Sequence, residues 1–416
     1  MNANLYSRAA ALAAALILAG RAAAQDWPGW RGPARDGRLA GFQPPARWPE
    51  KLERAWQVQV GGGHATPALV AGRLYVHARQ GEDEVVLCLD AETGKEIWKD
   101  RVPAPYKPEP SAESHGTGPF ASPAVADGRV FTFGITGILS CLDAATGKVL
   151  WRQDFRDRFP KPWPEWGAAA SPLVDRGLLI VQAGGKNKGA VLALEAGTGK
   201  VRWSWDGDGP GYASPVAAEI GGKRQILTQT QNHAVGLSAE DGRLLWKIEY
   251  KTEYEQNSVT PVVLDNLVIL SGYRRGVTAW RLEGESPAQA WHTDEVSMYM
   301  STPLLKGDRL FGFSEKRRGQ FFCLNARTGE TLWTGDGRQG ENAALLDAGT
   351  AILALITEAP NRKDPAQLVV FDASDKDYTE RARWTVADGP AWAHPVVSGR
   401  TIFVKDGTSL ARWTIP

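Results

Sequence analysis

The sequence predicts an all-β fold, an eight-bladed β-propeller whose blades are four-stranded antiparallel sheets. Two short motifs alternate along most of the 416 residues, one ending in Trp and one beginning with Ser/Thr-Pro. One pair of motifs occupies roughly 40–50 residues, which is the length of a propeller blade. There is one more Ser/Thr-Pro motif than there are Trp motifs, and a strand near the N-terminus can complete the last blade.

The first motif is a β-hairpin that ends in Trp. Its clearest copies read Leu-Asp-Ala-x-Thr-Gly-Lys-x-x-Trp. Asp or Asn opens the turn by accepting backbone N–H groups, and Gly adopts the positive φ that the turn requires. Clear copies occupy 87–98, 140–151, 192–203, 236–246 and 322–333, and degenerate copies end at Trp291 and Trp384.

The repeated tryptophans are interpreted as structural. Each stands at a fixed offset on the returning strand, so we expect them to be mostly buried between blades and not to face a ligand. These docking positions are Trp56, Trp98, Trp151, Trp203, Trp246 and Trp333.

The second motif begins an inner strand. Ser or Thr precedes Pro, and apolar residues, a Gly or Asp turn and another apolar strand follow. Pro suits the first residue of a strand, where its missing N–H costs no ladder hydrogen bond. Because the hydroxyl repeats in most copies, we interpret it as the partner of a local backbone donor and not as a nucleophile. Copies start at Thr66, Ser122, Ser171, Ser214, Thr260 and Thr302, with variants at Ala343 and His394.

The count of motifs predicts how the ring closes. Eight strand starts are followed by seven Trp hairpins, and the last unit, 394–415, holds three strands. The segment 52–60, which contains Trp56, can supply the fourth strand. We therefore expect the strand at Trp56 to pair with the strand near Trp413 and close the ring, which protects the sheet edges from aggregation.

The N-terminus has the features of a cleaved signal peptide. Arg8 precedes an apolar run at 9–19, and three alanines fit a cleavage site before Gln25. The run is shorter than the ~20 residues that span a bilayer, and an uncleaved anchor or a buried helix are the alternatives. No Cys follows it, so we expect a periplasmic or extracellular protein that is not a lipoprotein. The chain then divides into a signal peptide (1–24), an N-terminal extension (25–51) and the propeller (52–416).

The charge balance excludes some partners. There are 48 Lys and Arg against 47 Asp and Glu. A balanced charge gives no net field to attract a polyanion, so we do not expect nucleic acid or an anionic membrane surface as a partner. No membrane-length apolar stretch follows the signal peptide. We expect a monomer whose partner is an envelope protein or a small polar-aromatic ligand.

The Trp hairpin resembles the docking motif of eight-bladed quinoprotein dehydrogenases and of the BamB propellers of outer-membrane assembly. The tract at 27–37, Trp-Pro-Gly-Trp-Arg-Gly-Pro-Ala-Arg-Asp-Gly, is similar to one in secreted propeller repeat proteins related to those that bind pyrroloquinoline quinone (PQQ). The resemblance implies an envelope propeller that either binds a partner or carries out quinone chemistry. It covers nearly all of the mature chain, but a fold does not decide between these functions.

The quinone alternative has specific requirements. The resemblance implies a vicinal Cys pair over the quinone, Glu and Asn ligands to calcium, and an Asp base. Here Cys88, Cys141 and Cys323 occupy one repeat position in different blades, too far apart for a disulfide, so we interpret them as buried thiols. No Cys or His spacing typical of zinc occurs. We predict no metal and no cofactor, with PQQ and calcium as the alternative.

The loops that enter the innermost strands nominate a site. These loops share one face of a propeller, and the innermost strands line its channel. The residue three places before each Pro position varies while its neighbours repeat, and variation on a fixed scaffold is typical of recognition. A water-filled channel with an assorted lining is the alternative. This variable ring consists of His64, Phe120, Ala169, Tyr212, Ser258, Met300, Glu341 and Trp392.

Two long connections, 101–118 and 155–166, could overhang the same face. Packing of their tryptophans onto the ring is the alternative. The predicted ligand- or partner-binding residues are His64, His115, Trp166, Tyr212, Asn257, Glu341, Asn342, Trp392 and His394.

Three functions follow from these features. The favoured one is a secreted or periplasmic propeller that acts as a ligand- or protein-binding scaffold, with no catalytic residue predicted. The second is a PQQ-dependent dehydrogenase. The third is a hydrolase or lyase that uses a His/Glu pair at the channel mouth.

Overall fold

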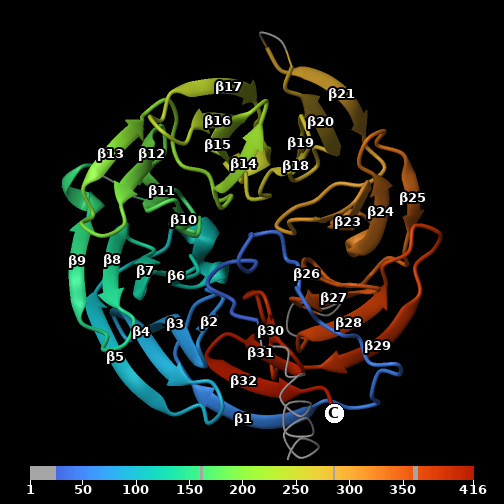
Figure 1. Cartoon of the computed structure of the whole chain (residues 1–416), viewed down its shortest axis with the longest axis horizontal. Helices are drawn as coiled ribbons and strands as arrows, with labels where there is room; N and C mark the ends of the chain where they lie inside the picture. The colour runs from blue at the N-terminus through green and yellow to red at the C-terminus, as the bar shows by residue number, and fades with distance from the viewer. Residues whose placement is uncertain (1–24, 160–162, 284–285, 359–363) are drawn as a thin grey trace, which may run out of the picture.

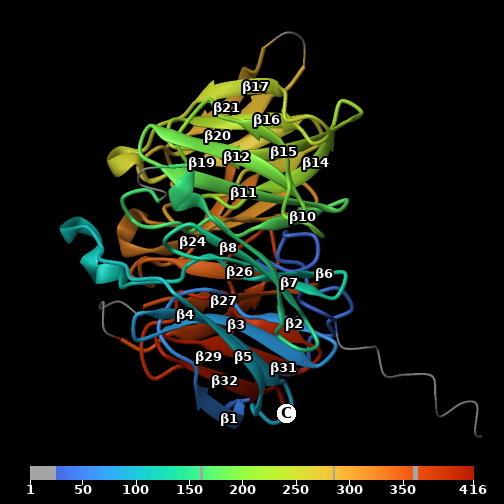
Figure 2. The ribbon, with the colours of Figure 1, turned by 90° about the vertical axis from the view of Figure 1, so that its left-hand side faces the viewer.

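The computed structural model describes residues 25–159, 163–283, 286–358 and 364–416, so the predicted signal peptide lies outside the described residues. Within these ranges, 32 strands form eight four-stranded antiparallel sheets arranged around a central axis (Figure 1). The predicted eight-bladed propeller is therefore confirmed. Figure 2 shows the same ring from its side.

The first four blades follow one another along the chain, each running from an innermost to an outermost strand. They comprise β2 (Ala68–Val70), β3 (Arg73–Gln80), β4 (Asp83–Asp90) and β5 (Glu96–Pro103); β6 (Ala124–Ala126), β7 (Arg129–Phe133), β8 (Ile138–Asp143) and β9 (Val149–Asp154); β10 (Leu173–Asp175), β11 (Leu178–Gly185), β12 (Lys188–Glu195) and β13 (Val201–Trp205); and β14 (Val216–Ile220), β15 (Lys223–Gln229), β16 (His233–Ser238) and β17 (Leu244–Glu249).

The next three blades repeat this order, and the eighth is composite. They comprise β18 (Val262–Leu264), β19 (Leu267–Ser271), β20 (Val277–Arg281) and β21 (Ala288–Thr293); β22 (Leu304–Lys306), β23 (Arg309–Ser314), β24 (Gln320–Asn325) and β25 (Thr331–Thr334); β26 (Ala343–Ala348), β27 (Ala351–Ile356), β28 (Gln367–Asp372) and β29 (Glu380–Thr385); and β30 (Val396–Ser398), β31 (Thr401–Lys405) and β32 (Ser409–Thr414) with β1 (Glu53–Gln59).

The ring closes as the motif count predicts. Strand β1 pairs antiparallel with β32, so that Trp56 lies opposite Arg412 and Arg54 opposite Trp413. The chain thus begins and ends its propeller in one sheet. This pairing replaces two open edges by a ladder of backbone hydrogen bonds.

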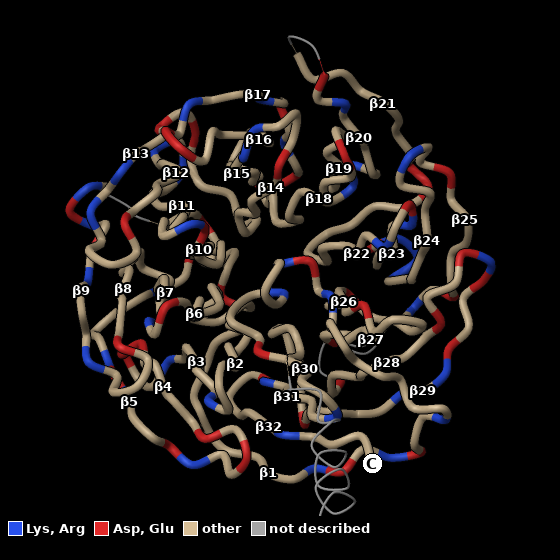
Figure 3. Tube along the Cα trace, in the orientation of Figure 1, with Lys and Arg blue, Asp and Glu red and all other residues tan. Residues whose placement is uncertain are grey.

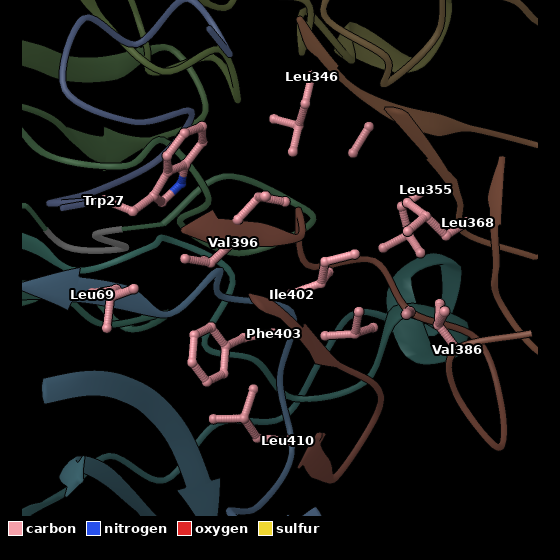
Figure 4. Packing of buried hydrophobic residues seen from close by; sticks show 14 of the residues in the cluster. Trp27, Leu69, Leu346, Leu355, Leu368, Val386, Val396, Ile402, Phe403 and Leu410 are labelled. Atoms are coloured by element: carbon pink, nitrogen blue, oxygen red, sulfur yellow. The ribbon is translucent and has the colours of Figure 1, made fainter. Parts of the chain in front are cut away.

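The hydrophobic core lies between adjacent blades. Alternate strand residues point to opposite faces of each sheet, and each face packs against the next blade. The cluster in Figure 4 joins blades 7, 8 and 1, with Leu355, Phe403 and Leu69 among its members. Trp27 of the N-terminal extension is part of the same cluster and is fully buried.

The repeated tryptophans lie over the turn of a neighbouring blade. The indole N–H of Trp98 donates to Ala144 O (3.1 Å), and its ring lies against Gly147, where a Cβ would come within 2.5 Å of it. The turn therefore requires Gly147 for two reasons: its φ is +74°, and a side chain there would collide with the Trp98 ring. Four further docking tryptophans donate in the same way to the next blade, namely Trp56, Trp151, Trp203 and Trp333.

Trp246 departs from this pattern. Its indole N–H donates to the Gln225 side chain of its own blade at 2.7 Å. The docking positions also differ in burial: Trp203, Trp246 and Trp333 are buried, whereas Trp56, Trp98 and Trp151 are half-buried.

The cysteine position of the repeat is explained by these tryptophans. Cys88 lies opposite Trp98 in the strand ladder, Cys141 opposite Trp151 and Cys323 opposite Trp333. A small residue fits opposite a large ring, and Ala193 and Gly236 occupy the same place in other blades. All three cysteines are free and buried, as predicted. Burial raises the pKa of these thiols to between about 11 and about 12.

Helical structure is confined to short turns in the described residues. These are the 3-10 helices η1 (Pro110–His115), η2 (Phe155–Asp157), η3 (Glu253–Glu255) and η4 (Lys316–Arg318). None of the helices described is long and apolar enough to cross a membrane. Figure 3 shows acidic and basic residues interspersed around the ring, in keeping with the balanced composition.

Candidate functional site

The N-terminal extension closes one end of the central channel. Residues 25–41, here called the plug, run through the middle of the ring in Figure 1 and bond to blades 1, 2, 3, 6, 7 and 8. Trp27 and Leu69 exchange two backbone hydrogen bonds (2.6 and 2.8 Å), and Leu39 N donates to Asp347 O at 2.9 Å. We call the face where the chain enters the innermost strands the mouth face. The plug lies toward the opposite face.

Two arginines hold the plug in place through backbone oxygens. The Arg31 guanidinium donates to Thr302 O and Pro303 O, both at 2.8 Å. The Arg35 guanidinium donates to Ser171 O and to Pro172 O. Burial lowers the pKa of Arg31 to about 10 and that of Arg35 to about 9, so both stay charged at neutral pH.

A cavity of about 190 Å³ lies in the channel, with Trp30 of the plug in its wall. Both plug guanidinium groups lie over the Trp30 ring, at 5.6 Å for Arg31 and 5.3 Å for Arg35. The plug therefore turns a through-channel into a pocket. Its wall consists of Trp30, His64, Thr66, His115, Phe120, Ser122, Trp166, Ala169, Ser171, Tyr212, Ser214, Gln256, Ser258, Met300, Thr302, Trp392 and His394.

The variable ring converges on this cavity. Seven of its eight members line the wall, and each comes from a different blade. Glu341 is the member that does not. The short innermost strands explain the convergence, because each begins close to the axis and presents the residue before it to the channel.

The repeated hydroxyls hold neighbouring blades together. The prediction of a local backbone partner was wrong, since the donor is the amide of an adjacent blade. Each hydroxyl lies close to the amide of the adjacent blade, because equivalent residues of all blades lie at the same level of the channel. The bonds run from Thr66 N to Ser122 Oγ, Ser122 N to Ser171 Oγ, Ser171 N to Ser214 Oγ, Thr260 N to Thr302 Oγ1 and His394 N to Thr66 Oγ1, at 2.9–3.2 Å. Ala343 N donates instead to Ser301 Oγ, the hydroxyl just before the repeated position, at 2.9 Å.

Aromatic rings dominate the cavity wall. His64 stacks on Phe120 with a centroid distance of 5.3 Å and an interplanar angle of 10°. Trp392 lies 6.0 Å from the His64 ring and 6.1 Å from the His115 ring. Such offset and edge-to-face contacts fix ring orientation and present flat apolar surfaces to a ligand.

Two histidines of the cavity wall, His64 and His394, are neutral at physiological pH. Burial, with a contribution from the Lys405 charge, lowers the pKa of His64 to about 4. Burial and the charge of Arg31 lower the pKa of His394 to about 3. His64 Nε2 lies 3.0 Å from His115 O, which fixes its ring. These side chains therefore offer hydrogen-bonding groups without charge.

Both long connections reach the cavity. The Arg79 guanidinium binds Ala104 O (2.9 Å) and Thr117 O (2.8 Å), which anchors the first connection near His115. In the second, Trp166 N donates to the Tyr212 hydroxyl at 3.3 Å. The His115 and Trp166 rings then meet edge to face at 5.2 Å.

Six of the nine predicted site residues line the cavity, and three do not. Asn257 is fully buried; its Nδ2 donates to Tyr250 O and Thr230 O, and its backbone oxygen accepts from Tyr212 N. Asn342 Oδ1 accepts from Met300 N at 3.1 Å. Both asparagines thus position wall residues from behind. Glu341 is half-buried and stands outside the wall.

Trp30 is a wall residue that the sequence analysis missed as a site residue. The signal was present, because Trp30 belongs to the tract at 27–37. What could not be read from sequence was that this tract crosses the channel. Gln256 was missed as well; it lies beside the ring position Ser258, and its Oε1 accepts from the Tyr299 hydroxyl.

The sequence matches the protein family described as "Outer membrane protein assembly factor BamB" over residues 35–115 and 83–335. BamB of Yersinia pestis is 22% identical over 304 residues, which cover 68% of this chain and 70% of that protein. Quinohemoprotein alcohol dehydrogenase ADH-IIG of Pseudomonas putida is 32% identical over 165 residues, which cover 37% of this chain and only 21% of that protein.

Solved structures share the fold. BamB of Moraxella catarrhalis aligns with a TM-score of 0.63 and 16% identity, covering 88% of this chain and all of that one. Quinohemoprotein alcohol dehydrogenase of Comamonas testosteroni aligns with a TM-score of 0.66 and 15% identity, covering 94% of this chain and 80% of that one. At such identities the likeness concerns the fold alone, so the choice between binding and catalysis rests on the cavity.

Proposed function

Because the chain belongs to the family described as "Outer membrane protein assembly factor BamB", we propose that it is a binding propeller of the bacterial cell envelope. It recognises a small ligand or an envelope protein at the mouth face. The observation that carries this proposal is the convergence of variable residues from seven blades on one cavity. A scaffold that is constant except at one ring of positions is suited to recognition.

The proposal places the mature protein in the periplasm or outside the cell, as a monomer without a lipid anchor. The apolar run before Gln25 supports export. Relatives named as outer membrane protein assembly factors support an envelope role.

The wall does not fit a calcium–quinone centre. Calcium binds carboxylate and carbonyl oxygens, yet none of the wall residues is Asp or Glu. Nor does the described part of the chain contain a cluster of three or more His, Cys, Asp or Glu side chains that could hold a metal. The cavity of about 190 Å³ is also below the ~300–1,000 Å³ usual for drug-sized ligands.

The hydrolase alternative also lacks support from the wall. Glu341, its acidic partner, is not a wall residue. His64 and His394 have pKa values lowered to about 4 and about 3, so they are weak bases at neutral pH. The binding function therefore accounts for more of the site than either catalytic alternative.

Titration with PQQ separates the binding function from the dehydrogenase alternative. We expect no tight binding of PQQ by the mature protein in calcium-containing buffer, because the wall offers no carboxylate to calcium. We also expect no turnover in dye-linked alcohol and aldose oxidation assays. Isothermal titration calorimetry measures the first and dye reduction the second.

A contrary result has a clear form. Stoichiometric PQQ binding together with calcium-dependent turnover, both lost in Trp392→Ala, would show that the cavity is a quinone site. Glu341→Ala is the matched control, because that residue belongs to the variable ring but not to the wall.

A further inference from the structure

We propose that the cavity selects a small aromatic carboxylate, with the ring between the aromatic walls and the carboxylate toward the channel hydroxyls. This inference rests on the proposed function, since it names the ligand class of the same site. Three features carry it: the shape of the cavity, its free hydrogen-bond donors, and the charges behind its wall.

The shape favours a single aromatic ring. A volume of about 190 Å³ leaves room for a small ligand only. His64 and Phe120 form a stacked pair on one part of the wall, and Trp392 and Trp166 contribute two more rings. Flat apolar walls favour a flat ligand, because stacking buries most of its surface.

The donors favour a ligand that accepts hydrogen bonds. Each channel hydroxyl of the wall already accepts one backbone amide from a neighbouring blade. A hydroxyl has one hydrogen to donate as well, and within the described residues none of these hydrogens has a protein acceptor. The five hydroxyls belong to Thr66, Ser122, Ser171, Ser214 and Thr302.

Two wall side chains add polar atoms that lack a partner. Trp166 Nε1 and His394 Nδ1 are shielded from solvent, and neither has a hydrogen-bond partner among the residues described. The indole N–H can only donate. Because water does not reach these two atoms, the channel hydroxyls are the donors that a ligand in the cavity can contact.

The charges behind the wall are positive. Arg31, Arg35 and Lys405 are bonded to backbone oxygens, and none of the three forms an ion pair within the described ranges. Lys405 is fully buried, and its Nζ lies 2.6 Å from Gly63 O, next to His64. Asp36 and Asp406 offset part of the charge on Arg31 and Lys405.

Two acidic groups act on Tyr212 near the mouth. Glu255 forms an ion pair with Lys186 at 3.2 Å, whereas Glu165 accepts a hydrogen bond from the neutral Ser111 hydroxyl and keeps its charge. Aromatic cages often bind cations. Here the Trp30 ring already carries two guanidinium groups, so a cationic ligand would add a like charge nearby.

Three nearly isosteric probes test the charge preference: benzoate, benzamide and benzamidinium, which carry charges of −1, 0 and +1. We expect benzoate to bind the mature protein about tenfold more tightly than benzamide, because hydrogen bonds to a charged group are stronger than those to a neutral one. Benzamidinium should bind more weakly than benzamide. Ligand-observed NMR titration at constant ionic strength measures all three affinities.

A substitution locates the site. Trp166→Ala removes one aromatic ring of the wall, and we expect it to weaken benzoate binding about tenfold. Trp163→Ala is the matched control, since Trp163 lies in the same connection, packs on Tyr106 and is not a wall residue. It should leave benzoate binding unchanged.

The outcomes separate the two proposals. Equal affinity for the three probes, or preference for benzamidinium, would overturn the carboxylate preference while leaving a binding cavity. Benzoate binding that is weakened equally by both substitutions would overturn the location. If none of the probes binds, the carboxylate inference fails, and the binding function is then judged by cross-linking at the mouth face.

Discussion

A chain that begins at Gly61 is expected to lose its cooperative unfolding transition. This truncation removes the seven residues of β1, six of which pair with β32. It also removes Trp56, which donates to Glu92 O at 3.0 Å and packs against Gly94 of blade 1. The outer edge of β32, its partner in the sheet, would be left open.

The effect should exceed that of any single substitution, since a whole strand and an inter-blade contact disappear together. Thermal unfolding followed by circular dichroism measures it. A chain that begins at Leu52 is the matched control, because it lacks the plug but keeps β1. If the chain from Gly61 unfolds as cooperatively and at the same temperature as this control, the closure of the ring by β1 contributes nothing to stability.

Trp203→Ala should destabilise the protein by about 3–5 kcal/mol, the range for truncation of a large buried aromatic side chain. Trp203 is 7% exposed, its N–H donates to Ala239 O at 3.2 Å, and its ring lies against Gly242 of the next blade. Removing it leaves a cavity between blades 3 and 4 and an unpaired carbonyl. Denaturant unfolding of the mature protein measures the loss.

The control for this substitution lies on the same strand. Val201 is 37% exposed, so Val201→Ala should change the free energy of unfolding by only about 0.5 kcal/mol. A similar small loss for Trp203→Ala would show that the docking tryptophans do not hold the blades together.

The architecture could be predicted because its determinants are local and repeated. Each Asp-x-x-x-Gly turn and each Trp specifies its own hairpin, and counting them gave both the blade number and the composite eighth blade. The hydroxyl repeat was recognised as structural, but its partner was assigned wrongly. The hydrogen bond crosses between blades, and nothing in the local sequence distinguishes that donor from a nearer one.

The part of the site that lies at a fixed position in each repeat could be predicted from sequence. The variable ring occupies such a position, and seven of its members line the cavity. The plug is not part of any repeat, and Trp30 is placed in the wall by hydrogen bonds between residues 25–41 and six separate blades. Asn257 and Asn342 have the polar side chains of ligand-binding residues, yet these side chains bond to the protein backbone: Asn257 to Tyr250 O and Thr230 O, and Asn342 to Met300 N.

The plug also explains why the tract at 27–37, which precedes the propeller repeats, belongs to the site. Trp27 anchors it in the core, Arg31 and Arg35 fasten it to backbone oxygens, and Trp30 between them faces the cavity. The tract at 27–37 therefore both blocks the channel and helps to set the electrostatic character of the pocket.

The central claim, that recognition takes place at the mouth face, is tested most directly by photo-cross-linking in the cell envelope. A photoreactive amino acid at Tyr254, which is 65% exposed in η3 on the mouth face, should yield a discrete adduct. The same group at Lys223, the exposed first residue of β15 on the opposite face, should yield none. Trp392→Ala should abolish the Tyr254 adduct and Glu341→Ala should preserve it. An adduct from Lys223 alone, or a Tyr254 adduct that survives Trp392→Ala, would contradict the account.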